Sequence, residues 1–266
     1  MYRQYIGYFR IIGKNNITWW KGMRLMGVRI DRDMLAQKAD ELGVKLQEQA
    51  LDKFEIYAGL LVEWNEKINL TAIIQPDEIV IKHFIDSLTV SPFLPKGEIS
   101  LIDVGSGAGF PGVPLGIIRP DIKLTLLDSL NKRLVYLKEL CAALGIPVTL
   151  IHARAEQAGR NESYREKFDV AVARAVADLP VLCEYCLPFV RIGGSFIAMK
   201  GREGDKQAEA AKGAASSLGG RLTRTHNIIL ENGDETMERC LLLFDKYKAT
   251  SSKYPRIGVK IKKQPL

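Results

Sequence analysis

The stretch Leu101–Gly112, LIDVGSGAGFPG, decides the fold of this chain. An apolar run leads into alternating glycines, and a second apolar run, Leu124–Leu127, ends in Asp128. A strand, a glycine turn, a short helix and a strand with an acid at its tip bind an adenosine-containing cofactor at the carboxyl edge of a parallel sheet. We expect Gly105 and Gly107 to let the backbone approach that ligand. Asp128 should accept hydrogen bonds from its ribose.

Asp103 distinguishes between the cofactors that this turn could hold. The run GAGFPG also satisfies the G-x-G-x-x-G pattern of NAD-binding proteins. A dinucleotide, however, would lay its pyrophosphate on the turn and the next helix N-terminus, where the Asp103 carboxylate would repel it. S-adenosylmethionine carries a sulfonium and an ammonium instead, and Pro114 and Pro120 confine the helix to roughly two turns. We predict S-adenosylmethionine, with an NAD-dependent oxidoreductase or a turn without any ligand as the alternatives.

Composition limits the class of protein. The chain has 266 residues, of which 47% are hydrophobic, and this suits one large α/β domain with an appendage. Because no apolar run approaches the roughly 20 residues of a membrane span, we expect a cytoplasmic protein without a membrane partner. Cys183 and Cys186 form a C-x-x-C within a helical pattern. With no second pair, they are interpreted as buried apolar residues and not as metal ligands.

The positive charge gathers at the two ends of the chain. Formal net charge is +7, yet residues 1–30 hold six basic residues and residues 253–263 hold five, neither with an acid. The ends are therefore either solvated charged segments or sites of phosphate contact. Residues 1–30 also follow no apolar period. We interpret them as a leader or an overlong start, with the working protein beginning near Met23, Met26 or Met34.

The order of elements predicts a class I S-adenosylmethionine-dependent methyltransferase. A helical appendage is expected over 31–95, with helices at 32–42, 47–67 and 76–91. Strand and helix then alternate, which predicts a mostly parallel sheet. The strands are expected at 100–104, 123–128, 147–151, 168–174 and 193–199, and the helices at 112–119, 131–144, 154–160, 178–190 and 202–218. Two late strands, at 222–230 and 239–245, have no helix between them and predict a closing antiparallel hairpin in a seven-stranded sheet. The methyltransferase domain is thus expected over 96–248 and a basic tail over 249–266.

Several segments resemble one family. They are NLTAI at 69–73, KHFIDSLT at 82–89, DVGSGAGFPGVPL at 103–115, LLDSLNKRLVYL at 126–137, and the long run from 173 to AMKG at 198–201. They are similar to the bacterial small-subunit ribosomal RNA guanine-N7 methyltransferases, the glucose-inhibited division protein B family. The resemblance covers roughly residues 34–266. It implies methyl transfer to guanine N7 of 16S ribosomal RNA, either free or in the small subunit. We expect the protein to be a cytoplasmic monomer that does not bind DNA. The alternatives are a methyltransferase for another RNA or a small molecule, and a non-catalytic RNA-binding assembly factor.

The resemblance also implies site residues. It assigns cofactor contacts to Gly105, Phe110, Ala155, Glu156 and Arg174. From the residues alone, Phe110 could belong to the core, Glu156 could be a solvated acid at a helix start, and Arg174 could serve an ion pair. Candidate phosphate binders, each of which could instead be an ordinary surface charge, are Arg133, Lys200, Arg202, Lys253, Arg256, Lys260, Lys262 and Lys263.

The implied reaction needs no catalytic base. Guanine N7 has an exposed lone pair and no proton at neutral pH, and no catalytic dyad is evident among His83, His152 and His226. His83 is interpreted as either a structural residue or an RNA contact. Rate should come from holding N7 in line with the methyl group. Because the N7 edge is inaccessible in A-form RNA, the target should be an unstacked or flipped guanine.

Overall fold

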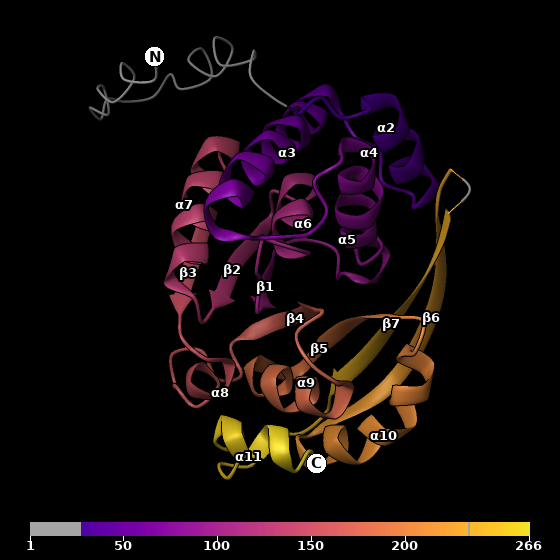
Figure 1. Cartoon of the computed structure of the whole chain (residues 1–266). Coiled ribbons are helices and arrows are strands. Elements are labelled where there is room, and N and C mark those ends of the chain that lie inside the picture. The colour runs from indigo at the N-terminus through magenta and orange to yellow at the C-terminus, as the bar shows by residue number, and fades with distance from the viewer. Residues whose placement is uncertain (1–27, 234) are drawn as a thin grey trace.

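The computed structural model describes residues 28–233 and 235–266, so most of the expected leader, residues 1–27, lies outside the described residues. Its core is a seven-stranded sheet with the order β3-β2-β1-β4-β5-β7-β6. The strands are β1 (Ile99–Val104), β2 (Ile122–Asp128), β3 (Val148–His152), β4 (Phe168–Arg174), β5 (Val190–Gly201), β6 (Gly220–Asn232) and β7 (Glu235–Lys246). The first five run parallel, and β7 joins β5 and β6 antiparallel. The predicted class I fold with its closing hairpin is therefore confirmed (Figure 1).

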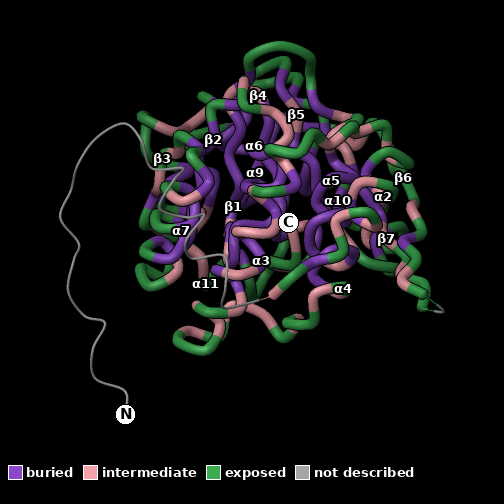
Figure 2. The backbone as a smooth tube through the Cα atoms, turned by 90° about the horizontal axis from the view of Figure 1, so that it is seen from above, coloured by how far each residue is buried: buried purple, intermediate pink, exposed green. Residues whose placement is uncertain are grey.

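Helices cover both faces of this sheet. They are α6 (Gly112–Ile118), α7 (Asn131–Leu144), α8 (Ala155–Ala158), α9 (Leu179–Cys186), α10 (Gly204–Ser217) and α11 (Gly258–Lys263). One apolar core joins α6 and α7 to the N-terminal helices, and the other joins α9, α10 and α11 to the opposite face. Double coverage leaves the central strands buried along nearly their whole length (Figure 2), which explains their continuous apolar sequences. The predicted burial of Cys183 and Cys186 in α9 is also confirmed.

The N-terminal helices share the first of these cores. α2 (Arg32–Glu41) and α3 (Glu48–Ile68) follow the predicted ranges, and α3 buries the apolar stripe that includes Phe54, Tyr57 and Leu61. The expected helix at 76–91 is divided into α4 (Pro76–Ile79), a π-helical segment η1 (Val80–Ile85) and α5 (Asp86–Leu88). In the π segment the Asp86 amide donates to the Ile81 carbonyl, five residues back. Such segments are rare and occur often at functional sites.

The closing hairpin and the C-terminal tail also differ from the sequence expectation. β6 and β7 extend through most of the expected connection, and they pair as far as Asn232 and Glu235. The expected basic tail is not an open segment but includes the helix α11, which packs on α9 (Figure 1). Within residues 28–233 and 235–266, no helix combines the length and apolar character that crossing a membrane requires.

Candidate functional site

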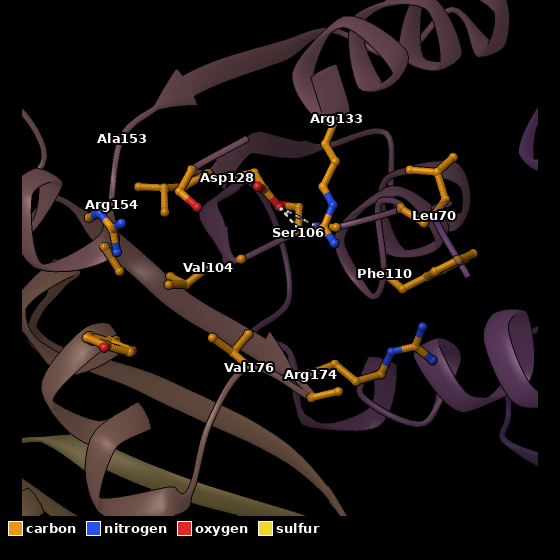
Figure 3. Close-up of a pocket in the computed structure, with 18 of the residues that line it drawn as sticks. Leu70, Val104, Ser106, Phe110, Asp128, Arg133, Ala153, Arg154, Arg174 and Val176 are labelled. Atoms are coloured by element: carbon orange, nitrogen blue, oxygen red, sulfur yellow. Dashed lines mark hydrogen bonds and ion pairs between the residues drawn. The ribbon is translucent and has the colours of Figure 1, made fainter. Parts of the chain in front are cut away.

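A cavity of about 420 Å³ opens at the carboxyl ends of the first four strands (Figure 3). Its size lies within the ~300–1,000 Å³ usual for small-molecule sites. The glycine turn after β1 and the tips of β2, β3 and β4 form most of the wall. Leu70, Thr71 and His83 contribute from the N-terminal helices, and Lys262 contributes from α11. Both ends of the described chain therefore help to build a site that the sheet alone would leave open.

The glycine turn has little room for side chains. Gly105 and Ser106 donate their amides to the Leu127 carbonyl, which ties the turn to β2. Gly105 has a φ of +77°, and a Cβ atom there would lie 2.8 Å from the Val176 side chain. Any other residue at this position would therefore be strained and would collide with the β4–α9 loop. The packing of the turn itself therefore requires glycine here, and the approach of Gly105 to a ligand stays a prediction.

Asp128 lies beside this turn with its carboxylate held in place. Its Oδ2 accepts from the Gly107 amide at 2.9 Å, and its Oδ1 accepts from the Leu130 amide at 2.9 Å. The Arg133 guanidinium is 3.4 Å from Oδ2, and this predicted phosphate binder lines the cavity (Figure 3). Asp128 is only 2% exposed, yet carboxylate oxygens have further lone pairs. It can thus accept hydrogen bonds from a ribose without moving.

Asp103 does not face the cavity, which corrects the expectation that it contacts the cationic part of the cofactor. Side chains alternate along a strand, and Asp103 shares the α6 side of β1 with Leu101. Its Oδ2 accepts from the Gly112 amide at 2.9 Å, while Oδ1 has no hydrogen-bond partner among the described residues. Burial raises the pKa of Asp103 to about 7. Asp103 therefore supports the glycine turn through its hydrogen bond with the Gly112 amide.

Phe110 combines the two roles that the sequence left open, because it lines the cavity and is packed in the core. Its ring stacks on Tyr57 at 5.1 Å and on His83 at 4.4 Å between ring centroids. The Arg174 guanidinium lies 4.8 Å from the same ring. Tyr57 also donates its hydroxyl to the Ala108 carbonyl at 2.7 Å. The N-terminal helices therefore fix the shape of the glycine turn directly.

Arg174 is both an ion-pair residue and a cavity residue. Its Nη1 donates to Asp86 Oδ2 at 2.8 Å, and Asp86 Oδ1 accepts from Arg239 Nε at 2.9 Å. Burial and the neighbouring Arg174 lower the pKa of His83 to about 3, so its ring is neutral. Sequence reasoning missed Asp86 and Arg239. The signal for Asp86 was an acid within the otherwise apolar end of KHFIDS.

Glu156 and Ala155 line the far end of the cavity, beyond β3. Glu156 is 9% exposed, so it is not the solvated acid that one interpretation allowed. A Cβ atom on Gly258 would collide with the Glu156 carboxylate, which means that α11 packs directly against this side chain. The expected set of cofactor contacts is thus gathered at one cavity, with the exception of Asp103.

Comparison with known proteins identifies the family. The family model described as rRNA small subunit methyltransferase G matches residues 50–234. This chain belongs to that family. The curated methyltransferase G of Acetivibrio thermocellus is 46% identical over 236 residues, covering 88% of this chain and 96% of the relative. That of Clostridium perfringens strain 13 is 43% identical over 237 residues, covering 88% and 98%. A solved Pyrococcus horikoshii structure assigned as a transferase, with a TM-score of 0.50, 12% identity and 65% coverage of both chains, shares the fold alone.

Membership of the methyltransferase G family confirms the predicted resemblance and makes S-adenosylmethionine the cofactor. The residues of the cavity fit this molecule. Asp128 presents a fixed acceptor for a ribose diol, and Gly105 and Gly107 line the cavity beside it. Phe110 offers a ring edge and Glu156 an acceptor within the same cavity. The Asp128 and Glu156 carboxylates suit the positive charges of this molecule. Of the cations that also line the cavity, Arg133 is paired with Asp128 and Arg174 with Asp86.

The predicted phosphate binders of the methyltransferase G chain have different surroundings. Arg256 is a correction, because it forms two-pronged hydrogen bonds with Glu184, whose carboxylate is fully buried. It therefore anchors the C-terminal segment and is not available to RNA. Lys200 donates to the Ala177 carbonyl at 2.7 Å, and Arg202 is exposed beside Glu238 at 3.3 Å. Lys253 lies over the Tyr254 ring, and Lys260 and Lys263 are exposed.

The C-terminal segment, residues 250–266, is held by more than this ion pair. Arg165 donates to the carbonyls of Thr250 and Tyr254, and Arg160 donates to that of Pro255. Ile261 is fully buried in the core beneath α11. These contacts place the Lys262 side chain at the edge of the cavity. The segment is basic in composition but packed in structure.

Proposed function

We propose that this chain transfers a methyl group from S-adenosylmethionine to N7 of a guanine in 16S ribosomal RNA. The observation that carries the proposal is the cavity at the carboxyl ends of β1–β4, where the fixed Asp128 lies beside the glycine turn. The names of the relatives, ribosomal RNA small subunit methyltransferase G, support this substrate. We further propose that the protein works as a cytoplasmic monomer, on free 16S RNA or on the small subunit.

The proposed reaction needs no catalytic base. S-adenosylmethionine supplies an electrophilic methyl group on a sulfonium. Guanine N7 brings a lone pair and loses no proton, so the protein need not remove one. His83, which lines the cavity, is a poor base because its pKa is lowered to about 3. Its ring nitrogens also lie 2.9 Å from Thr71 Oγ1 and 3.2 Å from Arg174 Nη2.

The protein then contributes position and electrostatics. The stacked rings of Tyr57, Phe110 and His83 form one rigid wall of the cavity, because all three rings are buried. Exposed cations near the opening, Arg154 and Lys262, can attract the RNA backbone. Holding two reactants in line can supply a large part of a rate enhancement. Shape and charge are therefore the main contributions of this site.

The test is methylation of ribosomal RNA by the purified protein. Small subunits and naked 16S RNA from cells that lack this enzyme are incubated with S-adenosylmethionine, and nuclease digests are analysed for N7-methylguanosine by mass spectrometry. We expect one methylated guanine in one of the two substrates. The Asp128→Ala variant should bind S-adenosylmethionine about 1.5–3 kcal/mol more weakly while remaining folded, since a charged hydrogen-bond acceptor is lost. Methylation at another base, or of neither RNA, would contradict the proposal.

A further inference from the structure

A second hollow adjoins the cofactor cavity. It has a volume of about 520 Å³ and shares Ala175, Val176 and Lys262 with the first cavity. Its other walls come from the loop between β4 and α9, the end of β5 and the end of the chain. The residues that line only this hollow are Ala177, Asp178, Val181, Lys200 and Pro265. A molecule seated here would lie next to the cofactor cavity, on the side that Ala175, Val176 and Lys262 line.

The loop that lines both cavities is strained. Ala175 has a φ of +55°, in the left-handed region that residues with a Cβ atom seldom adopt. Such strain persists only where the surrounding structure enforces it, and it gathers at functional sites. Lys200 supplies one restraint, since its Nζ donates to the Ala177 carbonyl at 2.7 Å. The loop is therefore held in a fixed shape where the two cavities adjoin.

Asp178 stands at the N-cap of α9 but does not cap it. Its side chain makes no capping hydrogen bond, and the adjacent Leu179 amide donates to Gln207 Oε1 at 3.1 Å. Asp178 is exposed and lines the second hollow. Across the described residues, no hydrogen bond or ion pair engages its carboxylate. An acid at this position that gives up its usual local partner is available for a ligand.

Lys200 faces the same hollow from the end of β5. An ammonium has three donors, and the bond to Ala177 uses one of them. Val176, Val181 and Pro265 add apolar surface to the walls. The hollow thus combines an acceptor of two hydrogen bonds, a cationic donor and apolar sides. That combination matches a flat base with adjacent donors on one edge and a carbonyl oxygen on the next.

We propose that this hollow binds the guanine that is to be methylated, and that Asp178 and Lys200 select it. The Asp178 carboxylate would accept from guanine N1–H and from the 2-amino group, while Lys200 would donate to O6. Adenine would present an acceptor, N1, to the carboxylate and a donor, its 6-amino group, to the lysine. The same two side chains therefore attract guanine and repel adenine. This inference rests on the proposed function, because it assigns the acceptor base of that reaction.

The test compares guanosine with inosine, which lacks the 2-amino group. The target guanosine is first mapped with the wild-type enzyme and is then replaced by inosine in the same RNA. We expect kcat/KM for N7 methylation of the inosine RNA to fall about 10-fold or more, since one good bidentate contact discriminates by roughly 10- to 100-fold. The Asp178→Asn variant should lose roughly 10- to 100-fold on guanosine RNA. On inosine RNA it should lose much less, because part of the contact is already absent.

Two controls separate this contact from other effects. S-adenosylmethionine affinity of Asp178→Asn should match that of the wild type, because Asp178 does not line the cofactor cavity. Glu209→Gln removes an exposed acid from α10, away from both cavities, and should leave kcat/KM unchanged. Lys200→Met should weaken activity on guanosine and inosine RNA alike, because both bases keep O6.

The outcomes distinguish this inference from the function on which it rests. If the wild type methylates guanosine and inosine RNA equally well, or if Asp178→Asn loses the same factor on both, the assignment of Asp178 is overturned and the proposed function stands. If the wild type forms no N7-methylguanosine in ribosomal RNA, the proposed function is itself overturned, and the base assignment with it.

Discussion

The cavity has two side walls that come from opposite ends of the described chain and differ in how they are built. The N-terminal wall is the aromatic stack of Tyr57, His83 and Phe110 with its supporting helices. The C-terminal wall is the segment 250–266, held by one buried ion pair, several carbonyl contacts and Ile261. The first wall depends on apolar packing, which leaves a periodic trace in sequence. The second depends on charges with buried partners, which look in sequence like charges in solvent.

The largest expected effect lies in the C-terminal wall. Arg256→Met should lower the free energy of unfolding by about 3–5 kcal/mol, because it leaves the fully buried Glu184 carboxylate without its partner. Lys263→Met, at an exposed position of α11, should change it by less than about 0.5 kcal/mol. Urea unfolding of both variants measures the difference. If Arg256→Met proved as stable as the control, the C-terminal segment would be a solvated arm and the comparison of walls would fail.

Acid should weaken the N-terminal wall next. His83 has a pKa of about 3 in the folded protein and about 6.5 when unfolded. The unfolded chain therefore binds the proton first, and the stability that neutral His83 contributes is lost as the pH falls from about 6.5 toward 3. Between pH 6.5 and 4.5 this loss should be on the order of 2 kcal/mol. Unfolding free energies of the wild type and His83→Gln, measured over this range, should diverge by that amount. The exposed His152 gives a control variant, His152→Gln, that should follow the wild type.

A smaller effect should follow from the hydroxyl that joins the N-terminal wall to the glycine turn. Tyr57→Phe removes the donor to the Ala108 carbonyl and keeps the stacking on Phe110. We expect a loss of about 1–2 kcal/mol in stability, since a buried acceptor is left unpaired. S-adenosylmethionine affinity, measured by calorimetry, should fall as well because Ala108 lines the cavity. An unchanged affinity would mean that the glycine turn keeps its shape without this wall.

The smallest effect on stability should come from the exposed lysines of the C-terminal wall. Changing Lys253, Lys260 and Lys263 to Gln should alter the unfolding free energy by less than about 0.5 kcal/mol. If they touch RNA phosphates, the log–log salt dependence of RNA affinity should flatten by about 0.7–0.9 per lost contact. Lys262 is left in place because it lines the cofactor cavity. Equal salt slopes for the variant and the wild type would limit the role of this segment to structure.

The difference between the walls also explains what the sequence could predict. The strands and most helices were predictable because apolar runs, prolines and glycines mark them locally, and β1 and β2 ended within a residue of their expected limits. Arg256 was misinterpreted as a free cation because its partner, Glu184, lies in a distant helix. The side of β1 on which Asp103 lies could be inferred only once the strand's register was known. Asp86 forms ion pairs with two arginines from β4 and β7, and no local sequence pattern indicates these long-range contacts.

The π-helical segment Val80–Ile85 sets the rotational phase of the helix that contains it. An α-helix turns by about 100° per residue. A π segment holds one residue more in a hydrogen-bonded turn than an α-helix does. His83 faces Phe110 and the cavity, while Asp86 reaches Arg174 and Arg239. Deletion of one residue here would restore a regular helix and swing one of these groups away from its partners. Insertions and deletions should therefore be tolerated far less in these six residues than in the β6–β7 turn, although neither segment is part of the glycine motif.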